Sequence, residues 1–245
     1  MEKEYSRLLV TKDDEMMLRV PIERVSRVVL VGRAGATTPA MHALLGAGIP
    51  LLLVTRSGRL VGRLSPPTAA NLALRRAQYR RDGEAAFCLE LAQSIAAGKV
   101  RNQRTLARRL ARRHEGIDDV FAADLEEAIG RMETAKDLDT VRGIEGYAAR
   151  RYLGIYRQAF DAQWGFKKRT RRPPRDPINA LLSLGYTLLG QNLTTALEIV
   201  GLDPYLGYFH GEAYGRAALA LDLIEEFRTP IIDSLVLTVI NHQTL

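Results

Sequence analysis

The chain has 245 residues, of which 47% are hydrophobic and 26% charged, so it can bury a sizeable core and is not of the disordered class. A formal net charge of +7 favours a polyanion such as nucleic acid as partner, although a modestly basic globular protein carries a similar excess. The single cysteine excludes an internal disulfide and a CxxC zinc site, and no apolar run approaches the length of a membrane span. The charged N-terminus lacks the apolar core of a signal peptide, so we expect a cytoplasmic protein.

The first part of the chain is predicted to be rich in β-strands. Two short strands flank a polar turn in a hairpin pattern, and further apolar strands follow. A short helix is expected after Thr37, because Pro39 suits its first turn. The predicted strands are 7–10, 16–20, 24–31, 49–54 and 59–64.

Pro66 and Pro67 end the β pattern, and the hydrophobic period then changes from two to about 3.6. We therefore predict an α+β protein with a β-rich domain over 1–66 and a helical domain over 67–245. The helices expected in the second domain are 71–81, 84–98, 104–113, 116–135, 139–160, 176–201, the run around 217–227, and 231–245.

Arginines dominate the segment after Gly98, a residue expected to end the helix before it. A stripe of basic side chains on one helix side could follow phosphates, and a solvated basic face is the alternative. The acidic helix expected at 116–135 could pair with the stripe. The stripe comprises Arg104, Arg108, Arg109, Arg112 and Arg113.

Glu145 stands between Gly143 and Gly146 in an otherwise apolar and aromatic helix. Glycine inside a helix costs about 1 kcal/mol relative to alanine. Two of them around one carboxylate indicate that a crossing helix or a bound ligand approaches the backbone closely.

The segment 165–175 packs six basic residues and two prolines into eleven positions. It is too polar for a core, so we expect an exposed loop that binds a polyanion. A localisation signal is the alternative interpretation of such a run.

His210 precedes a predicted helix that carries Asp222, Glu225 and Glu226. Positions three and four apart share a helix face, so these carboxylates crowd together. They are tolerated when solvated, or when a metal or basic partner neutralises them. Imidazole with carboxylates suits a hard or borderline divalent ion.

Motifs for other chemistries are missing. The sequence contains neither GxxxxGK[ST] nor GxGxxG, which argues against nucleotide binding through a glycine-rich loop. GxSxG is also absent, so serine hydrolysis is not indicated.

Five motifs, taken together and in this order, resemble the CRISPR-associated integrase family, Cas protein one, over nearly the whole chain. They are Lys99-x-x-Asn102-Gln103, Arg142-Gly143-Ile144-Glu145-Gly146-x-Ala148-Ala149, Asn179-Ala180-Leu181-Leu182, the run 201–210, and Asp222-Leu223-x-Glu225-Glu226-Phe227-Arg228.

The resemblance implies a metal-dependent DNA endonuclease and integrase. Its fold would be a small β-sandwich-like domain that pairs two protomers, followed by a larger helical catalytic domain. The implied metal ligands are Glu145, His210 and Glu225, with Asp222 as a supporting catalytic carboxylate. Glu225 is preferred to Glu226 because it lies three residues after Asp222, the spacing of the acidic pair in the family. The implied ion is Mg²⁺ or Mn²⁺.

The implied reaction inserts short DNA spacers into a CRISPR array by attack of a 3′-hydroxyl on a phosphodiester. Partners would be DNA, a second copy of the chain, and a small second Cas protein bridging two dimers. The residues expected to contact DNA are Arg142, Arg150, Lys167, Lys168, Arg169, Arg171, Arg172 and Asn179.

Two alternatives stay open from the sequence. One is a structure-specific repair nuclease that cleaves without integrating, and the other is a non-catalytic DNA-binding scaffold. Members of the family usually continue for several helices beyond the position matching Leu245, so we expect either a shortened member or part of a longer product.

Overall fold

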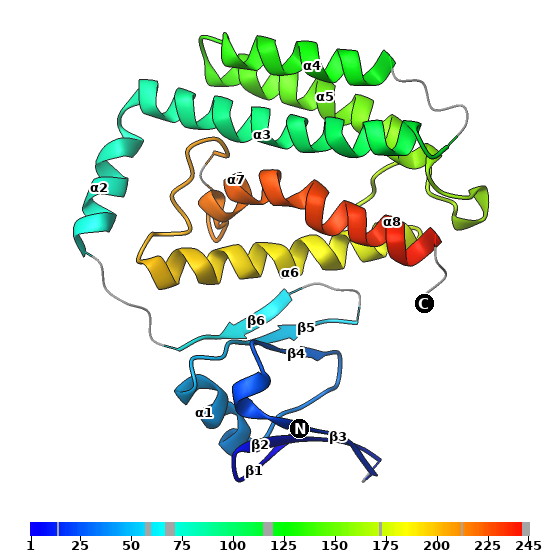
Figure 1. Cartoon of the computed structure of the whole chain (residues 1–245). Coiled ribbons are helices and arrows are strands. Elements are labelled where there is room, and N and C mark those ends of the chain that lie inside the picture. Colours follow the sequence, from blue (N-terminus) through cyan, green and yellow to red (C-terminus); the bar gives the residue numbers. More distant parts are fainter. Residues whose placement is uncertain are drawn as a thin grey trace. The chain divides into compact units, whose positions relative to one another are not determined.

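The computed structural model describes residues 1–13, 15–56, 60–66, 72–114, 120–171, 173–211 and 213–241. The chain divides into two compact units, Met1–Thr68 and Ala69–Leu245. The first unit holds the strands and the second is helical, which confirms the predicted α+β class (Figure 1). Pro67 and Arg172 lie outside the described residues, as do the parts of the predicted elements at 59, 71, 116–119 and 242–245.

Unit 1 contains two three-stranded sheets. The antiparallel sheet has the order β1 (Glu2–Glu4), β2 (Arg7–Lys12) and β3 (Glu15–Pro21). In the mixed sheet, β5 (Leu51–Val54) pairs in parallel with β4 (Val28–Val31) and antiparallel with β6 (Leu60–Leu64). The predicted hairpin is confirmed as β2 and β3. The strand predicted over 24–31 begins only at Val28, because the short 3₁₀ turn η1 (Ile22–Arg24) precedes it.

Helix α1 (Thr38–Gly46) supplies the crossover that a parallel strand pair requires, since it lies between β4 and β5 in the chain. Leu8 and Leu30 come from different sheets, yet they share one buried cluster with Leu44 of α1 and Leu51. Unit 1 is therefore a small sandwich-like domain whose two sheets and helix bury a common core.

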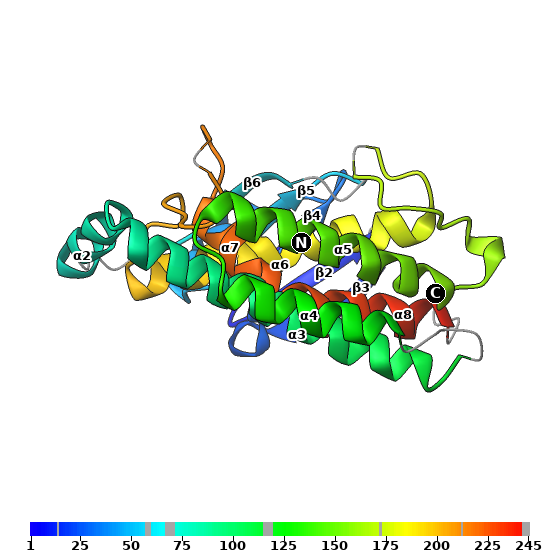
Figure 2. The same ribbon diagram turned by 90° about the horizontal axis from the view of Figure 1, so that it is seen from above.

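Unit 2 is built from helices that pack side by side, with α3, α4 and α5 running along one another (Figures 1 and 2). Its elements are α2 (Leu72–Asp82), α3 (Ala85–Ala111), α4 (Val120–Glu133), α5 (Leu138–Gln158), the 3₁₀ turn η2 (Ala162–Trp164), α6 (Pro177–Val200), α7 (Ala218–Phe227), the π-helical turn η3 (Arg228–Asp233) and α8 (Ser234–Asn241).

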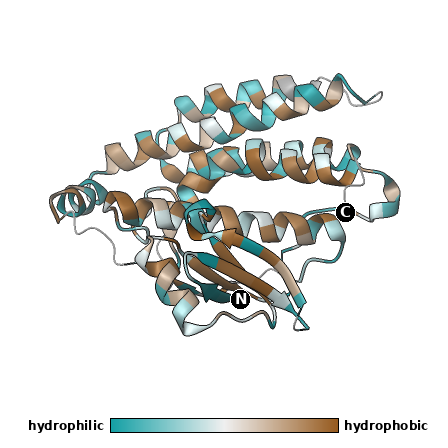
Figure 3. Cartoon of the chain, turned by 60° about the horizontal axis from the view of Figure 1, so that its bottom comes forward, coloured by the Kyte–Doolittle hydropathy of each residue, from teal (hydrophilic) through white to brown (hydrophobic). Residues whose placement is uncertain are grey.

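The helices of unit 2 are amphipathic, and hydrophobic and hydrophilic residues alternate along their ribbons (Figure 3). Their apolar faces meet in one large core, which includes the fully buried Val141, Ile155 and Ile178. Among the described helices, none combines the length and the apolar character needed to cross a membrane.

Local capping explains where two of the helices begin and end. The side chain of Asp137 accepts a hydrogen bond from the Thr140 N–H at the start of α5, and Asp176 does the same for Asn179 at the start of α6. Gly201 ends α6 in the left-handed conformation, with φ at 90°. The ends predicted for these helices therefore agree closely with the structure.

Gly98 does not end a helix, contrary to the sequence prediction. Helix α3 runs through it to Ala111, and a Cβ at position 98 would collide with the side chain of Glu226 on α7. This glycine therefore makes room for a neighbouring helix. Pro230 likewise does not end the helical run, because the wider turn η3 carries the chain past it into α8.

Candidate metal centre

Asp222 on α7 fixes the loop that carries His210. Its carboxylate is fully buried, and one oxygen accepts hydrogen bonds from the N–H groups of Tyr208 and Phe209 at 2.7 and 3.1 Å. The other oxygen accepts the N–H of His210 at 2.8 Å. Gly207 allows this close approach, because a Cβ there would lie 2.6 Å from the Cβ of Ala218. The backbone before His210 is therefore locked onto the helix.

The ring of His210 is oriented by the same carboxylate. Nδ1 lies 2.8 Å from Oδ1 of Asp222, so we assign the ring proton to Nδ1, since an ionised carboxylate only accepts. Nε2 then carries the free lone pair and lies 3.9 Å from Oε1 of Glu225. A carboxylate behind one ring nitrogen is the usual support for a histidine that binds metal through the other.

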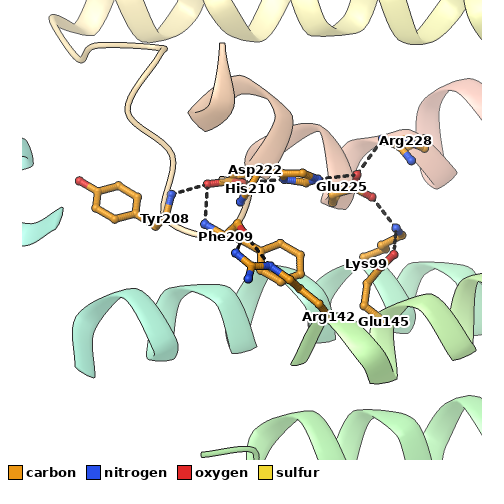
Figure 4. A network of polar contacts seen from close by, with 9 residues as sticks. All are labelled: Lys99, Arg142, Glu145, Tyr208, Phe209, His210, Asp222, Glu225 and Arg228. Atoms are coloured by element: carbon orange, nitrogen blue, oxygen red, sulfur yellow. Dashed lines mark hydrogen bonds and ion pairs between the residues drawn. The ribbon is translucent and has the colours of Figure 1, made fainter. Parts of the chain in front are cut away.

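Three helices bring charged groups together beside His210 (Figure 4). The ammonium of Lys99 on α3 contacts the carboxylate of Glu145 on α5 and lies 2.6 Å from Oε2 of Glu225 on α7. Arg228 Nη2 lies 2.8 Å from the other oxygen of Glu225. Burial raises the pKa of the Glu225 carboxyl, but the charges of Lys99 and Arg228 outweigh it, so the net shift is downward.

Glu225 and Glu226 face different surroundings. Glu225 is buried against Lys99 and Arg228, whereas the side chain of Glu226 lies over Gly98 of α3. The backbone carbonyl of Glu226 accepts a hydrogen bond from Asn102 at 2.8 Å. Of the two neighbouring glutamates, Glu225 is the one directed toward His210.

The three predicted metal ligands, Glu145, His210 and Glu225, do not surround a single point in the structure. Within the described parts of the chain, no three His, Cys, Asp or Glu side chains are arranged to hold an ion. Lys99 occupies the space between Glu145 and Glu225, and of these two carboxylates Glu225 is the one that His210 approaches. Two carboxylates already sharing one cation, next to an imidazole nitrogen, form a donor set that suits a hard or borderline divalent ion.

The glycines beside Glu145 do not serve a close helix crossing, which corrects one reading of the sequence. Among the described residues, nothing lies within 4 Å of a Cβ placed on Gly143 or Gly146. The backbone around Glu145 is thus open on the side of both glycines, and Glu145 itself is partly exposed.

Two residues expected to contact DNA instead hold the basic loop in place. Asn179 is fully buried and bonds to the backbone of Lys168 and Thr170 at 2.9 and 2.8 Å. Arg169 turns inward, where it donates to Asn179 Oδ1 and Ser183 Oγ at 2.8 and 3.0 Å. These contacts give both Asn179 and Arg169 a structural role in the loop.

The other residues expected to contact DNA differ in exposure. Lys167, Lys168 and Arg171 are exposed on the loop, and Arg150 is exposed on α5. Arg142 donates to the carbonyl oxygen of Phe209 at 2.7 Å, so it supports the His210 loop.

The arginine stripe of α3 is divided between two neighbours. Arg104 pairs with Glu126 of α4, as does Arg101 with Glu133, so the predicted pairing with the acidic helix is confirmed. Farther along the helix, Arg109 donates to Ser234 Oγ at 3.2 Å. Arg104 is half-buried, whereas Arg108, Arg109, Arg112 and Arg113 are exposed.

Lys99 and Arg228 belong to the site in the structure, although no role for them was predicted from the sequence. Both occur in the motifs quoted above, and Arg228 lies three residues after Glu225, the spacing of a helical ion pair. Lys99 lies 46 positions before Glu145, so no local pattern could join them.

Comparison with known proteins finds chains similar to this one. The family described as CRISPR associated protein Cas1 matches residues 1–245. A protein of Rhodospirillum rubrum named CRISPR-associated endonuclease Cas1 2 is 40% identical over 258 residues, covering 100% of this chain and 74% of its own length.

Two solved structures share the fold. In a Cas6-RT-Cas1–Cas2 complex, the matching chain has a TM-score of 0.81 and 30% identity, covering 99% of this chain and 27% of that one. A casposase bound to integration product has a TM-score of 0.85 at 24% identity, covering 99% of this chain and 70% of the casposase.

Proposed function

Because the chain belongs to the CRISPR-associated Cas1 family, we propose that it is a metal-dependent DNA endonuclease and integrase that inserts short DNA spacers into a CRISPR array. One observation carries this proposal. Glu145 and Glu225, from separate helices, share a single cation beside the Nε2 of His210, whose other nitrogen is held by Asp222. The relative from R. rubrum is named an endonuclease, and the casposase structure contains an integration product.

Each residue has a distinct role in the proposed reaction. Mg²⁺ or Mn²⁺ held by Glu145, His210 and Glu225 would act as a Lewis acid toward the attacked phosphodiester. Asp222 keeps the proton on Nδ1 of His210, so that Nε2 stays available as a donor atom. The 3′-hydroxyl of the incoming DNA replaces one phosphodiester bond by another, so the joining step requires no ATP.

The DNA would be held through its phosphates by the exposed part of the basic loop. Lys167, Lys168 and Arg171 are exposed cations of this loop. Met16, Met17 and Leu18 expose apolar side chains on the edge strand β3, which supports pairing of two protomers through unit 1. The proposal includes a second Cas protein as partner and a cytoplasmic location beside the array.

A strand-transfer assay with Mn²⁺ and a short duplex bearing free 3′ ends tests the proposal. Glu145→Ala and His210→Ala are each expected to lose activity by at least about 100-fold, since each removes a metal ligand. Circular dichroism and thermal unfolding check that both variants fold. Undiminished activity in both folded variants would reject the site.

The same assay separates integration from simple hydrolysis. Joined products longer than the target strand indicate strand transfer, whereas shortened strands alone indicate a structure-specific nuclease. DNA binding with neither product, together with absence of metal binding by calorimetry, would favour a non-catalytic DNA-binding scaffold.

A further inference from the structure

The ammonium of Lys99 occupies the position between two of the proposed metal ligands. Its side chain is almost fully buried, and Nζ contacts Glu145 and lies 2.6 Å from Oε2 of Glu225. An ammonium has three donors and no lone pair, so it neutralises carboxylates but cannot bind a metal. Lys99 and a divalent cation therefore compete for the same oxygens.

The charges around Lys99 show why the site needs a cation at all times. Glu145 and Glu225 would repel one another if nothing stood between them, and Glu225 is buried where solvent screens little. Arg228 neutralises only Glu225, through Oε1. Of the basic side chains drawn in Figure 4, Lys99 is the one that contacts both carboxylates.

We propose that Lys99 is the resident counter-cation of the metal-free site, and that a divalent metal binds by displacing its ammonium from Glu145 and Glu225. This inference rests on the proposed metal site. Its consequence is a site that stays assembled without metal, at the cost of a lower metal affinity than the same ligands would have without the lysine. The flexible four-carbon stem of lysine allows the ammonium to leave without moving α3.

Lys99→Met tests the proposal, because methionine keeps an unbranched side chain and removes the charge. Calorimetric titration with Mn²⁺ should show tighter binding by about tenfold or more, since a competing cation is gone. The metal-free variant should unfold at a lower temperature than the parent, and saturating Mn²⁺ should raise that temperature more than it does in the parent. Lys136→Met, at an exposed lysine, should change neither quantity.

Equal or weaker Mn²⁺ binding by Lys99→Met would overturn the proposal, because it would mean that Lys99 assists the metal rather than competes with it. Glu145→Gln separates this failure from failure of the metal site itself. If the parent binds no Mn²⁺, or Glu145→Gln binds it equally well, the proposed site is wrong. If Glu145→Gln weakens Mn²⁺ binding but Lys99→Met does not tighten it, the metal site stands and the displacement of Lys99 is wrong.

A measurement on the unmodified chain covers the case in which Lys99→Met does not fold. Acetic anhydride should acetylate Lys99 slowly in the metal-free protein and faster with Mn²⁺, because displacement breaks its ion pairs. Lys136 is the internal reference, since it is exposed and should react equally in both states. A rate at Lys99 that is unchanged by Mn²⁺, read by mass spectrometry, would contradict the displacement.

Discussion

At the scale of single residues, Asp222 connects the backbone to the chemistry of the site. Both of its oxygens accept hydrogen bonds from the loop 208–210, and one also meets the imidazole of His210. The spacing of Asp222 and Glu225 predicted a shared helix face. It could not predict that the Asp222 carboxylate is bound by backbone N–H groups of the loop while Glu225 faces His210 and Lys99. That difference depends on how the loop packs against α7.

Asp222→Asn should weaken Mn²⁺ binding by about 10- to 100-fold, the usual effect of losing the group behind a metal-binding histidine. The amide can accept through only one atom, so N–H groups of the loop lose a partner, at about 1–3 kcal/mol for each buried group. Calorimetry and denaturant unfolding measure the two effects. Glu90→Gln, at an exposed carboxylate of α3, is the control, and equal Mn²⁺ affinity in both variants would refute the role of Asp222.

Glu225→Gln should destabilise the metal-free protein by about 3–5 kcal/mol at pH 7, because it removes the buried carboxylate that neutralises Arg228 and shares Lys99 with Glu145. The folded pKa of Glu225 is lowered, so its stabilising effect is present above the pKa of an ordinary glutamate and disappears as the pH falls through the folded value. Urea unfolding from pH 7 to pH 3 should therefore show that the free energies of unfolding of the parent and of Glu225→Gln converge as the pH falls. A gap that stays constant over that range would contradict the ion-pair account.

At the scale of elements, some helix ends could be predicted from their capping residues, whereas others depend on packing against distant parts of the chain. Asp176 and Gly201 mark the ends of α6 as the sequence suggested. Gly98 and Pro230 carry the same kind of signal, yet the helical run continues through both. Gly98 is explained by contact with Glu226, which lies 128 positions later in the chain and so leaves no local trace.

Gly207→Ala should destabilise unit 2 by about 1–3 kcal/mol, because its Cβ would press on Ala218 of α7, including the backbone. The loop would move away from Asp222, so Mn²⁺ affinity should fall as well. Gly211→Ala provides a matched control from the same loop, since nothing described lies within 4 Å of a Cβ there. Thermal unfolding and calorimetry compare the two, and equal behaviour would show that the loop does not depend on this close approach.

The basic loop predicts a separable effect on DNA binding. Replacing Lys167, Lys168 and Arg171 together by glutamine should lower duplex affinity and reduce the salt slope by up to about 0.9 for each DNA phosphate that is no longer neutralised. Arg169 is left unchanged because it supports the loop. Fluorescence anisotropy from low to moderate salt measures both quantities. With Lys136→Gln as control, an unchanged slope in the triple variant would show that the loop does not meet DNA.

At the scale of the whole molecule, the change of hydrophobic period after residue 66 predicted a strand-rich part followed by a helical part. The motifs pointed to Glu145, His210, Asp222 and Glu225 as candidate site residues but gave no role to Lys99 or Arg228. Their contacts were not, because Lys99, Glu145 and Glu225 lie on three helices and meet only after these helices pack. The inward turn of Arg169 and the burial of Asn179 depend on the same packing.

In the proposed centre, Glu145, His210 and Glu225 together hold one divalent ion. The most direct test is the anomalous difference map of a crystal grown with Mn²⁺ and measured at the manganese absorption edge. We expect one peak bonded to both carboxylates and to Nε2 of His210, with the ammonium of Lys99 moved out of its place between them. A map with no peak at this position, or with a peak that leaves His210 or Glu145 unbound, would contradict it.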